Sequence, residues 1–239
     1  MNLALVQLTP TERGRSACLQ QALHAIDEAA DFDPTPDLVV LPGHAATGGA
    51  MPGKSWTRAM TDITVEALCG KVREWGVYAS AGVAVRAHER VTGAVILIDP
   101  SGDVVTWCEN EKLGLPHAYE GVETPLGRLG LVNVDGMDVH ALRSDSAPAD
   151  IVIVPVGHEL SSRRRRLLRE LVDPASSLGV VLGSSFRIVV RPGSRRDEEA
   201  DDGDWGTAVF DGGGRRLAGS THGSSMVRIT LPVCGAPAK

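Results

Sequence analysis

The sequence predicts an α/β fold built on mixed sheets. Short apolar runs of strand length, such as Leu38–Leu41, alternate with longer segments in which apolar residues recur at helical spacing. The last third of the chain places several strand-like runs close together. No internal repeat and no linker-like stretch interrupts the pattern, so we expect a single domain over residues 1–239.

The amino-terminal part begins with a strand over Leu3–Leu8. Pro10 and Thr11 begin a turn that leads into a helix running to about Ala30, because apolar residues recur there every three or four positions. Asp33-Pro-Thr-Pro36 ends this helix and precedes a second strand over Leu38–Leu41. The apolar face of the helix contains Leu19, Leu23, Ile26 and Ala30.

A second helix is predicted from about Asp62 to Trp75, with Thr61 or Asp62 as its N-cap. One side of this helix is apolar and includes Cys69, which is most simply a core residue. The full stripe is Val65, Leu68, Cys69, Val72 and Trp75.

The remaining elements are mainly strands separated by turns rich in glycine, proline and aspartate. Leu113–Glu123 is predicted to be a loop, and Ser161 or Ser162 is predicted to cap a helix over residues 163–172 that Asp173-Pro174 ends or kinks. The predicted strands are Tyr78–Val85, Gly93–Ile98, Val104–Cys108, Leu129–Val134, Asp150–Val154, Gly179–Ser184, Phe186–Val190, Ala208–Asp211, Arg215–Ala218 and Met226–Leu231.

Composition and charge limit the classes of partner. The formal net charge is −6, which predicts no broad electrostatic attraction to nucleic acid or to an acidic membrane surface. Four cysteines lie far apart without a CxxC spacing, so we expect reduced thiols and a cytoplasmic protein. Met1 leads directly into a strand, and no apolar run reaches membrane-spanning length. The expected partner is a small molecule or a protein.

Three segments in a fixed order carry a family resemblance. They are Asp37–Gly48, which contains Leu-Pro-Gly43-His, Gly102–Pro116, which contains Asn-Glu-Lys112, and Gly127–Asp135, which ends Val-Asn-Val134-Asp. Together they resemble the carbon-nitrogen hydrolase (nitrilase) superfamily over nearly the whole chain. The resemblance implies a four-layer α-β-β-α sandwich that pairs through outer helices into at least a homodimer, with no cofactor.

The same resemblance implies a catalytic triad of which only the lysine is present. Gly43 stands at the position of the glutamate general base, Lys112 at that of the oxyanion-stabilising lysine, and Val134 at that of the cysteine nucleophile. Glycine and valine can neither transfer a proton nor attack a carbon atom. The sequence therefore favours a catalytically degenerate member, serving as a ligand-binding or accessory subunit.

An enzyme with relocated catalytic residues is the alternative. Lys112 could act with Glu111, Glu120 or Asp135 on an amide, nitrile or acyl group, or it could be paired structurally with Glu111 or Glu120. Asp135 would be a replacement nucleophile after a one-residue slip, or else a residue of an Asp-Gly turn.

His44 and Cys108 complete the candidates for the pocket. Cys108 has the strand parity of Lys112, so its thiol either faces the pocket or is a small buried hydrophobe. His44 belongs to a set of histidines without HxH, HxxxH or HExxH spacing, and we therefore expect no metal site. That set is His44, His117, His140 and His158.

Overall fold

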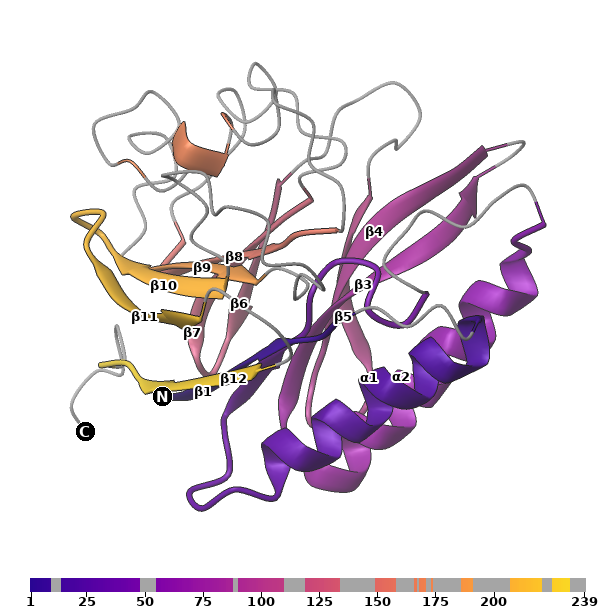
Figure 1. Ribbon diagram of the computed structural model, residues 1–239, viewed down its shortest axis with the longest axis horizontal. Coiled ribbons are helices and arrows are strands. Elements are labelled where there is room, and N and C mark those ends of the chain that lie inside the picture. Colours follow the sequence, from indigo (N-terminus) through magenta and orange to yellow (C-terminus); the bar gives the residue numbers. More distant parts are fainter. Residues whose placement is uncertain are drawn as a thin grey trace.

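Two six-stranded mixed sheets pack against each other in a computed structural model of the chain (Figure 1). Their contact is an apolar layer to which strands of both sheets contribute. The structure describes residues 1–9, 14–47, 55–87, 90–109, 119–133, 149–157, 166, 168–170, 173, 186–190, 207–220 and 225–232.

The first sheet has the strand order β12-β1-β2-β3-β4-β5. Its central strands β1, β2 and β3 are parallel, and the outer strands pair antiparallel. Its members are β1 (Asn2–Gln7), β2 (Leu38–Val40), β3 (Tyr78–Ala87), β4 (Arg90–Ile98), β5 (Val104–Glu109) and β12 (Ser225–Thr230).

The second sheet repeats this plan with the order β11-β10-β9-β8-β7-β6. Strands β7, β8 and β9 are parallel at its centre. Its members are β6 (Tyr119–Thr124), β7 (Gly127–Val132), β8 (Ile151–Pro155), β9 (Phe186–Val190), β10 (Thr207–Asp211) and β11 (Arg216–Ser220).

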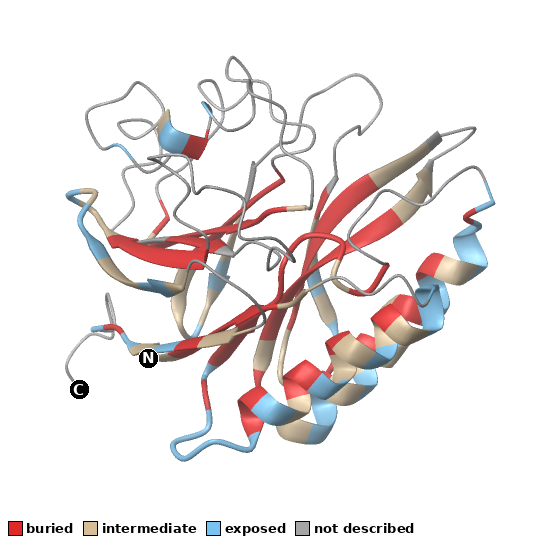
Figure 2. Cartoon of the chain, viewed as in Figure 1, coloured by how far each residue is buried: buried red, intermediate tan, exposed pale blue. Residues whose placement is uncertain are grey.

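Helices α1 (Arg15–Ala30) and α2 (Arg58–Trp75) lie side by side on the outer face of the first sheet (Figure 1). Their buried residues face the strands and their polar residues face solvent (Figure 2). Strand alternation separates the two apolar layers: Val39 packs under the helices, whereas its neighbour Val40 packs between the sheets.

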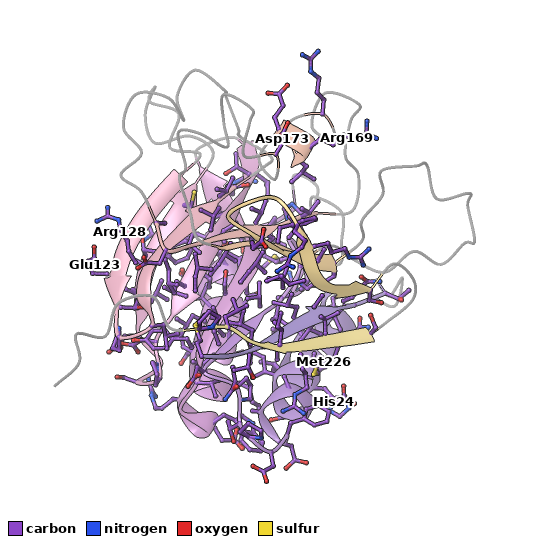
Figure 3. The ribbon with its side chains drawn as sticks, turned by 90° about the vertical axis from the view of Figure 1, so that its left-hand side faces the viewer. His24, Glu123, Arg128, Arg169, Asp173 and Met226 are labelled. Atoms are coloured by element: carbon purple, nitrogen blue, oxygen red, sulfur yellow. The ribbon has the colours of Figure 1, made fainter. Side chains whose placement is uncertain are left out.

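Helical residues also lie in the segment of the chain between β8 and β9 of the second sheet. Arg166 and residues 168–170 are helical, and the Asp173 backbone N–H donates to the Arg169 carbonyl at 3.0 Å (Figure 3). This bond has helical spacing, and Asp173 directly precedes Pro174, the residue predicted to end or kink the helix.

The α/β architecture and the four-layer sandwich class are confirmed.

Two sequence predictions were wrong. The cap of α2 is Thr57, whose side chain accepts from the Met60 backbone N–H at 3.3 Å, and not Thr61 or Asp62. Thr61 is buried instead, and its hydroxyl donates to the Ala84 carbonyl at 2.8 Å. The helix therefore begins at Arg58, four residues before the predicted start at Asp62.

The second error is part of the predicted loop over Leu113–Glu123. Residues 119–124 form β6, which pairs antiparallel with β7 along its whole length. In the sequence Tyr-Glu-Gly-Val-Glu-Thr the strand-favouring Tyr, Val and Thr alternate with Glu and Gly, which are depleted in strands, so its extended form depends on the ladder with β7. The predicted strand Gly179–Ser184 and most of the predicted helix over 163–172 lie outside the described residues.

Among the helices that the structure describes, none is long and apolar enough to cross a membrane.

Candidate functional site

The carboxyl ends of the parallel strands from both sheets meet at one end of the sandwich. Gly43 follows β2 in the first sheet, and its backbone N–H donates to the carbonyl of Val156, which follows β8 in the second sheet, at 3.0 Å. Asn133 follows β7 at the same end. Ligands of open α/β sheets bind outside the carboxyl ends of the strands, so this end is the candidate site.

Gly43 leaves no room for a side chain. A Cβ atom built on its backbone would lie 2.7 Å from the Gly157 nitrogen and 2.8 Å from the Val156 carbonyl carbon. Both of these atoms belong to the backbone, which cannot rotate away as a side chain could. Any residue larger than glycine at position 43 therefore requires the chain after β8 to move.

Gly82 of β3 closes the other side of Gly43. A Cβ on Gly82 would lie 2.5 Å from the Gly43 Cα and 2.6 Å from the His44 nitrogen. The backbones at Gly82, Gly43 and Gly157 thus stack on one another without intervening side chains. Position 43 is therefore enclosed by backbone on both sides.

His44 begins a tight turn at the same place. It is buried, with 4% of its surface exposed, and its φ of 59° is left-handed, which is uncommon for a residue with a side chain. Its carbonyl accepts from the Thr47 backbone N–H at 3.0 Å and from the Thr47 hydroxyl at 3.2 Å. His44 is therefore fixed in the wall of the candidate site.

Asn133 connects the end of β7 to the first sheet. Its side-chain amide donates to the carbonyls of Gly93 on β4, at 2.8 Å, and of Cys108 on β5, at 3.1 Å. It is 4% exposed and directly precedes Val134. The residue next to the expected nucleophile position is thus held by two hydrogen bonds.

Cys108 lies within the apolar layer between the sheets. Its side chain is fully buried among residues such as Val95 and Leu131. These surroundings favour the core role of Cys108 over a reactive one, because a cysteine in an apolar layer behaves as a small hydrophobe.

Of the other predicted site residues, only Glu120 lies in the part of the chain that the structure describes. Glu120 lies on β6, where its backbone pairs with Leu131, instead of in the expected loop. Four candidates lie outside the described residues, namely Glu111, Lys112, Val134 and Asp135.

Titratable groups with shifted pKa values lie elsewhere in the described part of the chain. Burial raises the pKa of the Cys69 thiol on α2, and burial also raises the pKa of Tyr78 at the beginning of β3. Within the described ranges, no three His, Cys, Asp or Glu side chains come together as ligands for a metal ion.

Sequence reasoning missed the residues that join the sheets at this end. Asn133 was visible as a polar break in the apolar run Leu129–Val134, and Gln7 as a polar residue in the first strand. A buried polar residue at a strand end is the signal that could have identified them, since such a group requires a partner. Gly82 and Gly157 gave no comparable signal.

The described strands and helices define a two-sheet α/β sandwich whose parallel strands end at one common edge. A model of the carbon-nitrogen hydrolase family matches residues 2–157 of the 239, and the chain belongs to that family. No curated protein gives a significant match.

Solved structures of amidases share this fold. An amidase from Nesterenkonia sp. superposes with a TM-score of 0.73 and 17% identity, covering 97% of this chain and 90% of the amidase. NitN amidase from Nesterenkonia sp. AN1 gives a TM-score of 0.72 and 17% identity, over 97% of this chain and 93% of that one. A variant of the AN1 amidase with acrylamide added to its active-site cysteine gives 0.71 and 16%, over 97% and 93%.

Proposed function

We propose that this chain is a carbon-nitrogen hydrolase family member that does not hydrolyse amides or nitriles and that acts as a ligand-binding or accessory protein. The observation that carries the proposal is the backbone packing at Gly43, where a Cβ would lie 2.7 Å from the Gly157 nitrogen. The general base is absent from the sequence, and its space is filled by the chain after β8.

The family reaction needs a thiolate that attacks the substrate carbon and a base that takes and returns the thiol proton. Gly43 and Val134 provide neither group. In a serine protease, removing the nucleophile alone lowers kcat by about a million-fold. Lys112 by itself would stabilise an oxyanion only if another group formed it, so its retention supports binding of a carbonyl or nitrile group.

The test is an assay of the purified full chain for ammonia release from a panel of ω-amides, nitriles and N-carbamoyl compounds. We expect no turnover above buffer. Turnover that disappears in Lys112→Ala, and also in Asp135→Asn, would overturn the proposal and establish a relocated active site around Lys112.

A thermal-shift measurement with the same compounds separates the two remaining roles. A compound that binds the folded chain stabilises it by about 2.7 kcal/mol at one hundred times its Kd. A concentration-dependent rise in Tm that Lys112→Ala abolishes would support ligand binding. No shift with any compound would favour the accessory role.

A further inference from the structure

Three polar junctions join the two sheets at the candidate-site end. The Gly43 N–H donates to the Val156 carbonyl at 3.0 Å, and the Gln7 side-chain oxygen on β1 accepts from the Thr207 N–H on β10 at 3.2 Å. The third junction is made by Asn133. Each connects an element of one sheet to an element of the other, whereas the layer between the sheets is otherwise largely apolar.

The Asn133 junction lies where two strands separate. The ladder between β4 and β5 runs from Ile98 and Val104 to Ala94 and Glu109. Asn133 donates one amide hydrogen to the carbonyl of Gly93, the next residue on β4, and the other to that of Cys108 on β5. Its side chain thus bridges the two strands at the end of their ladder and attaches both to β7.

The burial of this junction makes it strong. Asn133 is 4% exposed, Cys108 is fully buried, and Gly93 is buried as well. A buried carbonyl that loses its donor bears the full cost of its desolvation, so removing the amide costs more than forming the bond gains. The buried carbonyls of Gly93 on β4 and Cys108 on β5 therefore both depend on the Asn133 side chain for a donor.

We propose that the Asn133 side chain is a clamp that holds the carboxyl end of β7 to β4 and β5. The two sheets cannot separate at this end while the clamp holds. The inference concerns local opening of the sheets, so it holds whether or not the chain hydrolyses a substrate.

The experiment is hydrogen–deuterium exchange of the full chain, followed by peptide, in wild type and Asn133→Leu. Leucine approximates the size of asparagine but has no donor. We expect peptides covering Arg90–Ile98 and Val104–Glu109 to exchange at least tenfold faster in the variant, while peptides of α1 and α2 keep their rates.

Thr124→Val is the matched control. The Thr124 hydroxyl donates to the Gly127 carbonyl at 2.7 Å, so this variant also loses one side-chain donor, but within the turn between β6 and β7 of a single sheet. Faster exchange should be confined to Tyr119–Val132. Unchanged exchange of the β4 and β5 peptides in Asn133→Leu, or the same acceleration in both variants, would overturn the proposal.

Wild-type exchange keeps the proposal testable if Asn133→Leu does not fold. With the clamp in place, the peptide of β4, which is paired on both sides, should exchange as slowly as that of the central strand β3. Exchange of the β4 peptide that is tenfold or more faster than that of β3 in the wild type would show that the end of the ladder opens freely, and would equally overturn the clamp.

Discussion

The Trp75 indole on α2 donates a hydrogen bond of 2.7 Å to the Asp27 carboxylate on α1. The Lys71 ammonium lies 2.8 Å from the same carboxylate oxygen and 2.8 Å from Glu74. Burial raises the pKa of Asp27, but hydrogen bonds from Lys71 and Trp75 outweigh it and hold this pKa below 3.8. The two helices of the outer layer are thus joined by a charged carboxylate.

Asp27→Asn should lower stability at neutral pH by about 0.2–1 kcal/mol, because Lys71 loses its ion-pair partner while Trp75 keeps an acceptor. The folded-state pKa of Asp27 is depressed, so its contribution is present above the unfolded-state pKa and is lost as pH falls through the folded value. The difference between variant and wild type should therefore be constant from pH 7 to 5 and vanish below the ordinary carboxyl range. Urea denaturation across this pH range measures it.

Glu28→Gln is the control for this prediction. Its carboxylate is well exposed and lies 3.4 Å from His24, so the change should stay within about 0.5 kcal/mol at every pH. A loss in Asp27→Asn that persists unchanged at low pH would show that shape, not charge, causes it.

Gly82→Ala should destabilise the fold by about 1–3 kcal/mol or more, since the new methyl group would meet the backbone of Gly43 and His44. Gly70→Ala makes the same change on α2, where no atom lies within 4 Å, and should stabilise by about 0.5–1 kcal/mol. Chemical denaturation of both variants gives opposite signs if the backbone stack is as described. Equal stability of Gly82→Ala and wild type would contradict it.

Thr57→Ala should cost about 1 kcal/mol, because it removes the cap that accepts from the Met60 N–H. Thr57→Ser keeps the hydroxyl and should retain most of the stability. Asp62→Ala should change little, since Asp62 lies beyond the first turn of α2. Thermal unfolding compares the Tm of the three variants. A larger decrease in Tm for Asp62→Ala than for Thr57→Ala would show that Asp62, as predicted from the sequence, caps α2.

Introducing a glutamate at position 43 and a cysteine at position 134 should not produce hydrolysis. In Gly43→Glu/Val134→Cys the glutamate Cβ would collide with the chain after β8, so the carboxylate cannot reach its place without displacing Gly157. We expect a lowered Tm and no ammonia release from the amide and nitrile panel.

Val134→Cys alone is the matched control for that double variant. It should fold and carry a thiol near its ordinary pKa of about 8.5, with no turnover. Turnover by the double variant would show that the backbone around Gly43 yields readily and that the loss of activity lies only in the two side chains.

The sequence by itself determined the alternation of strands and helices, the mixed-sheet α/β class, and the order of the three family segments. These features are local: the apolar run over Val39 and Val40 or the stripe along α2 is encoded in neighbouring residues. The family resemblance also implies that Gly43 and Val134 stand at the positions of the family's glutamate and cysteine, and this stays a prediction.

Only the tertiary structure decided that position 43 is closed, that β6 is a strand, and that Asn133 joins the sheets. Each depends on a partner distant in sequence, namely Gly157 for Gly43, β7 for β6, and Gly93, 40 residues away, for Asn133. Glycine tolerates close backbone approach wherever it stands, and an asparagine has the same donors in a turn as in a core. The sequence shows which conformations and hydrogen bonds these residues allow. Packing of the two sheets decides which of them form, because the backbone atoms that exclude a side chain come together only in the packed sheets.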